Sequence, residues 1–211
     1  GADGSFVKTT NLKTLAVFDI KADDEAITLN TINLLFTDSV DALTNSNYLS
    51  NVGLYDGDSL ISNLLDVKNE ASQSFSINWT ISAGVTKELS VKGITDTITA
   101  ITNGDSIVTT FDSALGQGES SGETINNYGD LATTAITIYP SGIATPSTDA
   151  TRVMHNQGIL APMVNAPIGA IKIYGQREDM KLTDWIVYVS GTGYDDEADI
   201  SSVTIYDQDG T

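Results

Sequence analysis

The sequence contains no cysteine and a single histidine, His155, among its 211 residues. Without cysteine the chain has neither disulfide bonds nor thiolate ligands for a metal. One histidine alone cannot complete a transition-metal site of the usual composition, so we expect His155 to lie on the surface. A serine hydrolase triad would depend on that same side chain. These absences argue against zinc chemistry and against triad hydrolases.

Basic residues are also scarce. Asp and Glu number 28 against 10 Lys and Arg, which gives a formal net charge of −18. Nucleic-acid binding and docking on an anionic membrane both need clustered Lys and Arg, so we expect neither partner. The chain has no run of about 18 apolar residues, and we therefore predict no direct insertion into a membrane. The acidic charge favours solubility, cation binding or life in high salt.

Helical periodicity is nearly absent, and apolar residues recur at every second position instead. In residues 75–81 every odd position is apolar and every even position is polar. This period of two indicates half-buried β-strands. About seven to nine such segments with turns between them are typical of a Greek-key β-sandwich. The predicted core residues are Phe18, Ile20, Leu34, Phe36, Leu54, Ile77, Trp79 and Ile81.

The alternation slips by one residue within one predicted strand. Ile27 and Leu29 share one parity, whereas the apolar residues of the stretch 32–36 fall on the other. One extra residue in a strand indicates a β-bulge or a corner where the strand changes sheet. The same slip occurs between residues 180–182 and 185–189, which favours a common origin of the two stretches.

One stretch, residues 49–58, returns as residues 200–209: LSNVGLYDGD becomes ISSVTIYDQD. Upstream, residues 18–20 align with 171–173, 27–29 with 180–182, and 32–36 with 185–189. The period of about 150 residues exceeds the ~20–50 of solenoid repeats and indicates tandem domains, the second incomplete. We predict a sandwich at residues 1–140, a linker or edge strand at 141–167, and the N-terminal part of a second sandwich at 168–211.

Three local elements of the first copy follow from turn signals. The small residues 82–84 separate the alternating stretch 75–81 from apolar positions 89 and 91, which predicts a β-hairpin. Residues 116–130 are rich in Gly, Ser and Asn and are interpreted as a long surface loop. The acidic residues 23–25 are interpreted as a solvated turn.

Several of these segments together resemble a known family. They are LSNVGLYDG at 49–57, ISAGVTKELSVKG at 81–93, and an exit segment with AITI and ATPST at 135–148. The combination resembles the immunoglobulin-like repeats of very large secreted bacterial surface proteins, of S-layer and adhesin type. The resemblance implies an all-β, immunoglobulin-like Greek-key β-sandwich, tandem with an incomplete second copy, and a secreted location at the cell surface.

The densest carboxylates are Asp195, Asp196 and Asp199, with Asp207 and Asp209 a few residues on. Oxygen ligands at two-residue spacing before a Gly resemble the start of a calcium loop. A full loop needs a third near ligand and a distant Glu, and neither follows. Because Asp and Gly also suit ordinary turns, the sequence leaves both a calcium site and a plain turn open. It suggests no other cofactor.

Residues 118–122 read Gly-Glu-Ser-Ser-Gly and match the Gly-x-Ser-x-Gly pattern of a nucleophile elbow. That elbow needs a strand before it and a helix after it, and both flanks here are polar loop. No carboxylate lies in an aromatic segment suited to a sugar cleft. Trp79 and Trp185 have inward parity, which predicts core packing and not ligand stacking. We therefore assign no catalytic residue and predict that the chain is not an enzyme.

Asn78 begins the tripeptide Asn-Trp-Thr, which matches the acceptor pattern for N-glycosylation. It occupies a polar position of an alternating strand, so we expect its side chain to be accessible. Short patterns of this kind also arise by chance.

Two functions fit these features. The first is a structural, non-enzymatic extracellular surface module that assembles into a filament, a pilus-like fibre or an S-layer array. Its partners would be like chains, joined through edge strands or the incomplete C-terminal domain. The alternative is an adhesin or carbohydrate-binding module that uses the loops 37–48 and 116–130, where Tyr48 and Tyr128 are the available aromatics.

Overall fold

The computed structural model describes residues 4–39, 43–44, 46–68, 70–101, 104–152, 163–188 and 202–207, with the backbone only at Asn127 and Tyr128. Regular structure in these residues consists of strands alone, which confirms the all-β prediction. The strands are β1 Ser5–Val7, β2 Lys13–Lys21, β3 Ile27–Asp38, β4 Leu49–Asp56, β5 Ser59–Leu60, β6 Leu65–Val67, β7 Ser72–Ile81, β8 Thr86–Ile94, β9 Asp105–Gly118, β10 Thr124–Ala132, β11 Ile136–Tyr139, β12 Ile143–Thr148 and β13 Ile171–Gln176.

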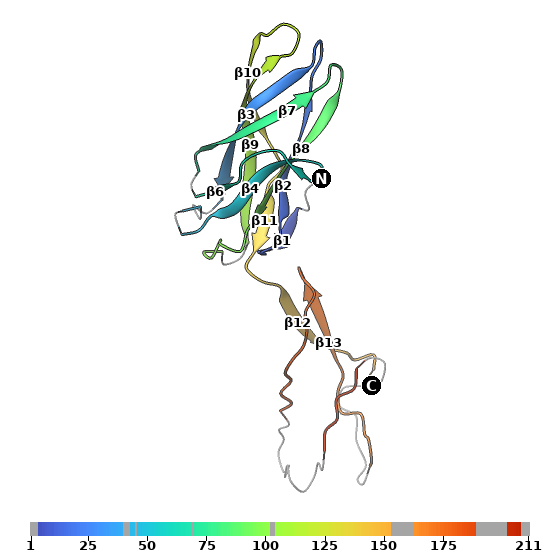
Figure 1. Ribbon diagram of the computed structural model, residues 1–211. Helices are drawn as coiled ribbons and strands as arrows, with labels where there is room; N and C mark the ends of the chain where they lie inside the picture. Colours follow the sequence, from blue (N-terminus) through green and yellow to red (C-terminus); the bar gives the residue numbers. More distant parts are fainter. Residues whose placement is uncertain are drawn as a thin grey trace. The chain divides into compact units, whose positions relative to one another are not determined.

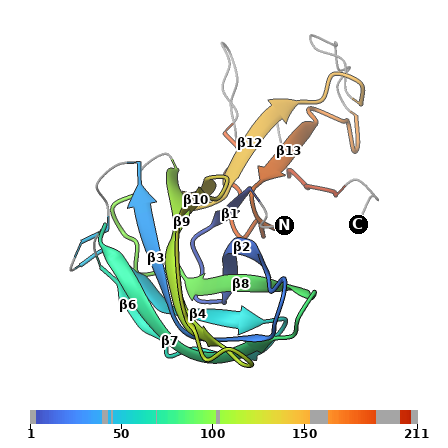
Figure 2. The same cartoon turned by 90° about the horizontal axis from the view of Figure 1, so that it is seen from above.

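Eleven of these strands form two sheets that enclose one core (Figures 1 and 2). The first sheet has the order β1-β11-β9-β3-β7, with β10 paired to β9. The second has the order β2-β8-β4-β5, with β6 paired to β4. Phe18 of β2 meets Phe111 of β9 edge to face across the core, with ring centroids 5.6 Å apart. This arrangement is consistent with a β-sandwich.

The predicted core residues do lie in this core. Seven of the eight are buried, and the eighth, Ile20, is partly buried and packs against them. Leu34, Phe36 and Leu54 have no measurable exposure at all. Burying each such side chain contributes roughly 1.5–3 kcal/mol. The alternating pattern was therefore sufficient to identify the inward faces of β2, β3, β4 and β7.

The predicted phase slip is a β-bulge within the single strand β3. Against β9, the register moves from Leu29 opposite Gly116 to Thr31 opposite Leu115, so two steps along β3 oppose one step along β9. Asn30 is the extra residue, and the register against β7 shifts at the same place. The bulge lets Leu29 and Ile32 both face the core despite their odd spacing. The corresponding slip in residues 180–188 falls where the chain has no regular strand.

The predicted hairpin of residues 75–91 is wrong. The turn is present, with Gly84 at φ 72° and Val85 N donating to Ser82 O at 3.1 Å. However, β7 pairs with β3 in one sheet, whereas β8 pairs with β2 and β4 in the other. Residues 82–85 therefore carry the chain from sheet to sheet. Alternation shows that a strand has one buried face but does not show which strand lies beside it.

The predicted surface loop at residues 116–130 is also wrong, because most of it is strand. β9 continues to Gly118, and β10 returns antiparallel to it from Thr124, with Ile125 opposite Gly116. Only residues 119–123 form the turn of this hairpin. The Gly- and Asn-rich composition has low β-propensity, and pairing with the long strand β9 outweighs it.

The first and last strands of the sandwich are neighbours. β1 pairs with β11 in parallel, with Ser5 opposite Thr137 and Val7 opposite Tyr139. Two flanking bonds extend this ladder, from Thr137 N to Gly4 O at 3.0 Å and from Lys8 N to Tyr139 O at 2.8 Å. The chain thus enters and leaves the sandwich along one edge of the first sheet.

β12 and β13 form a separate two-stranded antiparallel sheet, in which every residue is exposed. β12 lies within the predicted linker, and β13 begins the predicted second copy. By contact density the chain divides into two units, Gly1–Asp179 and Met180–Thr211. In the second unit, residues 180–188 and 202–207 have no regular secondary structure. The predicted limits 1–140, 141–167 and 168–211 stay a prediction.

Candidate functional site

A polar cluster joins the two sheets beside the turn that follows β4. The indole Nε1 of Trp79 on β7 donates a hydrogen bond to Oδ2 of Asp56 on β4 at 2.9 Å. The ammonium of Lys87 on β8 donates to the same oxygen at 3.0 Å and lies 5.5 Å from the centroid of the indole ring. These three residues are termed the Asp56 cluster. Each of its members is held by a different strand.

The contacts of the Asp56 cluster stabilise the ionised carboxylate. The hydrogen bond from Trp79 is the largest cause that lowers the pKa of Asp56, and the bond from Lys87 is the next. The Asp56 side chain is 38% exposed, so water screens its ion pair with Lys87. The greater effect on stability comes from the buried indole N–H, which finds an acceptor in Asp56.

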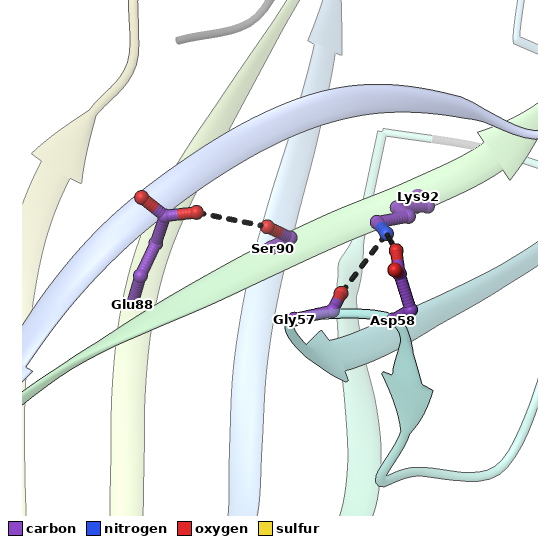
Figure 3. A network of polar contacts seen from close by, with 5 residues as sticks. All are labelled: Gly57, Asp58, Glu88, Ser90 and Lys92. Atoms are coloured by element: carbon purple, nitrogen blue, oxygen red, sulfur yellow. Dashed lines mark hydrogen bonds and ion pairs between the residues drawn. The ribbon is translucent and has the colours of Figure 1, made fainter.

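A second lysine holds the turn itself (Figure 3). The ammonium of Lys92 on β8 donates to the carbonyl oxygen of Gly57 at 3.0 Å and to Oδ1 of Asp58 at 3.3 Å. It also lies 4.9 Å from the centroid of the Tyr55 ring. Gly57 has φ 62°, a conformation that favours a residue without Cβ. Because Asp58 is fully exposed, its ion pair is weak, and the bond to the carbonyl fixes the turn.

These contacts give a physical account of two sequence motifs. Leu-Tyr-Asp-Gly at residues 54–57 supplies the carboxylate and the turn, and residues 87–92 of the second motif supply both lysines. This connection was not predicted from the sequence. One signal for it was available: a tryptophan at an inward position needs an acceptor for its N–H, and Asp56 ends a neighbouring apolar strand.

A second polar cluster fixes the turn between β9 and β10. Oε2 of Glu25 accepts hydrogen bonds from the backbone N–H groups of Ser120 at 2.8 Å and Ser121 at 2.9 Å. Oε1 of Glu25 accepts a third from the Ser121 hydroxyl at 2.6 Å. Beside it, Glu119 N donates to Ala26 O at 2.9 Å. The turn before β3 is thereby tied to the tip of the β9–β10 hairpin.

The same hydrogen bonds lower the pKa of Glu25. The Ser121 hydroxyl is the largest cause, followed by the backbone N–H groups of Ser121 and Ser120. The interpretation of residues 23–25 as a merely solvated turn is therefore wrong for Glu25. Its neighbour Asp23 does fit that interpretation, because both it and its ion-pair partner Lys21 are largely exposed.

The Glu25 contacts also explain the Gly-x-Ser-x-Gly match at residues 118–122. A Cβ on Gly118 would lie 2.3 Å from Oε1 of Glu25, and Gly122 has φ 69°. A side chain at position 118 would displace the Glu25 carboxylate, and the backbone at position 122 favours glycine, so both glycines suit the turn. The segment after it is strand β10 and not a helix, so the flanks of a nucleophile elbow are not met. The N–H of Ser120 is used to bind a carboxylate of the same chain.

A hollow of about 250 Å³ lies beside this turn. Its lining residues are Thr28, Asn30, Gln117, Gly118, Glu119 and Gly122. Glu119 is the one ionisable side chain among them, and the lining holds no serine and no histidine. The Thr28 hydroxyl of this lining is hydrogen-bonded to the Thr80 hydroxyl at 2.6 Å.

Four of the five calcium candidates, Asp195, Asp196, Asp199 and Asp209, lie outside the described residues, as does His155. Asp207 is described, in a stretch of the second unit without regular secondary structure. Within the described part of the chain, no three Asp, Glu or His side chains are grouped closely enough to hold a metal ion. The calcium site stays a prediction. Measuring the unfolding temperature with calcium and with a chelator tests it.

The remaining candidate residues are placed as follows. Asn78 is exposed on β7, as expected, while its neighbour Trp79 is buried with 3% exposure. Trp185, whose core packing was also predicted, is only half-buried. Tyr48 is half-buried, with the Lys68 ammonium 4.9 Å from the centroid of its ring. The side chain of Tyr128 lies outside the described residues.

No protein-family model, curated protein or solved structure significantly matches the chain. Across the residues described above, helices long and apolar enough to cross a membrane are not found.

Proposed function

We propose that the chain is a structural, non-enzymatic extracellular surface module that assembles with like chains into a filament, a pilus-like fibre or an S-layer array. The observation that carries this proposal is the exposed β12–β13 sheet. All twelve residues of its two strands are exposed. A two-stranded sheet of this kind is marginally stable at best in water, so it favours the addition of further strands.

The side chains of β13 support addition of strands or a covering layer. Ile171 is 51% exposed, Ile173 is 44% exposed and Tyr174 is 65% exposed. Their counterparts in the repeat include Phe18 and Ile20, which pack into the core of the first sandwich. Apolar side chains that are core residues in one copy and exposed in the other indicate an interaction surface.

The repeat and the two motifs of the Asp56 cluster support an immunoglobulin-like sandwich arranged in tandem. Residues 206–207 repeat the Tyr-Asp of residues 55–56 in the first copy. There, Lys87 donates to Asp56 and Lys92 donates to the carbonyl oxygen of Gly57, which holds the turn after β4. The two polar clusters bind turns and strands of their own chain. Their role is to stabilise the fold, and we therefore propose no catalytic activity.

Light scattering over a range of concentrations, with electron microscopy of the particles, tests this function. We expect assembly beyond the monomer, weakened by Ile173→Asp, which places a charge on the exposed β13 face. Leu131→Asp on β10 is the control, because Leu131 is an exposed apolar residue of the sandwich, at 60% exposure against 44% for Ile173. A chain that stays monomeric at every concentration contradicts the proposal.

The adhesin or carbohydrate-binding alternative stays a prediction. Of its two loops, residues 116–130 are mostly β-hairpin, and Tyr48 in the other is half-buried beneath Lys68. A glycan array tests it directly: binding to a defined sugar, lost on Tyr48→Ala, would favour this alternative over assembly.

A further inference from the structure

β2 is the terminal strand on one side of its five-stranded sheet. In the described part of the chain it pairs only with β8. Its other edge therefore presents backbone N–H and C=O groups that no strand among the described residues pairs. Such an edge can accept an added β-strand through main-chain hydrogen bonds.

Backbone hydrogen bonds identify which residues of β2 face this open edge. Ala22 N donates to Val85 O at 3.2 Å, and Ala22 O accepts from Gly84 N at 2.7 Å, so the backbone of Ala22 faces the β8 side. Along an antiparallel strand, successive residues direct their backbone N–H and C=O groups alternately to one edge of the strand and to the other. The register from residue 16 to residue 21 has no shift. The residues that present their N–H and C=O to the open edge are Val17, Asp19 and Lys21.

Backbone hydrogen bonds also identify the edge that each residue of β13, the counterpart of β2 in the repeat, faces. Asp149 N donates to Ala170 O at 2.8 Å, so Ala170 faces β12. The β12–β13 register has no shift, and Lys172 and Tyr174 therefore face β12 as well. Ile171 and Ile173 present their backbone groups to the opposite edge.

Aligning the two strands shows which edge β12 occupies. Lys172 corresponds to Asp19, and Ile171 corresponds to Phe18. Lys172 faces β12, and Asp19 faces the open edge of β2. β12 therefore lies on the edge of β13 that corresponds to the open edge of β2. The free edge of β13 corresponds to the edge of β2 that pairs with β8. Among the described residues of the first sandwich, no strand lies beside β2 in the place that β12 takes beside β13.

β12 is suited to pair along one edge only. Since Asp149 faces β13, Ser147 and Thr145 face it too, and Pro146 faces away. Proline has no N–H to donate, and natural edge strands carry it on the unpaired side. β12 therefore has a bonding edge and a closed edge, as expected for a strand that terminates a sheet.

We propose that the open edge of β2 binds the β12 segment, Ile143–Thr148, of a second copy of this chain as an added antiparallel strand. In its own chain β12 lies in a fully exposed two-stranded sheet. On β2 it joins a five-stranded sheet with a buried core, which favours the exchange. The register of β12 on β13, transferred to β2, places Ser147 opposite Asp19. This inference rests on the proposed assembly function and names the surface through which copies join.

Interchain disulfide formation tests the pairing, because the native chain has no cysteine to compete. A chain with Asp19→Cys is mixed with an isotope-labelled chain with Ser147→Cys, and mass spectrometry detects the mixed dimer. Directly opposite residues have Cα atoms about 5.5 Å apart, within the range of a disulfide. The matched control is Thr148→Cys, whose side chain points to the other face. We expect the mixed dimer with Ser147→Cys and its loss with Thr148→Cys. Equal yields, or no dimer with either, overturn the proposal.

Amide hydrogen exchange provides a second measurement on the unmodified chain. At assembling concentration the amides of Asp19 and Lys21, which lie opposite Ser147 and Thr145 in the transferred register, gain protection relative to dilute monomer. The amides of Phe18 and Ile20, which already face β8, do not. Protection of all four in the dilute monomer overturns the proposal, because the edge is then already covered. If light scattering shows assembly but neither the mixed dimer nor the added amide protection is seen, the copies join through another surface. The proposed pairing on β2 is then overturned while the proposed assembly function stands, so the two proposals fail separately.

Discussion

Trp79 and Asp56 form a direct hydrogen bond between the two sheets, with the indole Nε1 2.9 Å from Oδ2 of the carboxylate. Trp79 is 3% exposed, so its N–H has little access to water. Asp56 thereby combines two roles: it ends β4, and it supplies the acceptor for a core side chain of β7.

We expect Asp56→Ala to lower the free energy of unfolding by about 1–3 kcal/mol, because it leaves the buried indole N–H without an acceptor. Urea unfolding followed by circular dichroism measures the change. Asp58→Ala is the control. Its carboxylate lies two residues away, is fully exposed and pairs with Lys92, so we expect a clearly smaller loss of stability. Equal losses in the two variants would show that the bond to Trp79 contributes little.

Glu25 makes the stability depend on pH. Its pKa is lowered in the folded chain from the ordinary value of 4.5, so its hydrogen bonds stabilise the fold above that value. The stabilisation is lost as the pH falls below 4.5 through the pKa of the folded state. We therefore expect Glu25→Gln to be less stable than the native chain at pH 7, with the difference closing in acid.

Unfolding midpoints in urea between pH 7 and strongly acidic solution measure this difference. Glu119→Gln is the control, because it removes the same charge from the same turn without touching the bonds to Ser120 and Ser121. Since acid also reduces the net charge of −18, only the difference between variants is informative. A gap for Glu25→Gln that persists unchanged in acid contradicts the assignment.

Two variants in the turn at residues 118–122 test whether its Gly-x-Ser-x-Gly pattern serves the turn or a nucleophilic serine. Gly122→Ala forces a Cβ into a left-handed conformation and is expected to cost about 1–2 kcal/mol. Ser120→Ala keeps the backbone N–H that binds Glu25, and we expect a change within about 0.5 kcal/mol. Thermal unfolding of both variants checks this. A large loss with Ser120→Ala would mean that its hydroxyl has a role beyond the contacts described.

Two adjacent leucines on β3 test the parity imposed by the bulge at Asn30. Leu34 is fully buried, whereas Leu35 points to the other face and is half-buried. We expect Leu34→Ala to lower the free energy of unfolding by about 2–5 kcal/mol, and Leu35→Ala by clearly less. Chemical denaturation of the two variants gives the comparison. Equal costs would place the phase slip elsewhere in the strand.

The local pattern was a good predictor of which residues face inward. The direction of a side chain in a strand depends on its immediate neighbours, so Phe36 and Trp79 were identified as core residues. The phase slip was also predicted, as a bulge or a sheet-switching corner, and the structure shows a bulge at Asn30. The partner of each strand depends on the whole fold. For this reason the segments before and after Gly84 were predicted as a hairpin, although they lie in different sheets.

The candidate site was less predictable. The contacts of Glu25 with Ser120 and Ser121 join residues 95 and 96 positions apart, and no local pattern indicates such a distance. Its glycines were visible, but they matched an enzyme motif, because turns and nucleophile elbows both need residues without Cβ. The pairing of Asp56 with Trp79 was within reach, since an inward tryptophan requires an acceptor.

The parallel pairing of β1 with β11 has a mechanical consequence. Because both strands run in the same direction, a tensile force on Ser5 and on Tyr139 pulls them past one another, and all bonds of this ladder bear the load together. In an antiparallel pair loaded at one end, bonds would break one at a time. We expect single-molecule pulling across the sandwich to rupture it abruptly and at high force, because the whole β1–β11 ladder must break at once.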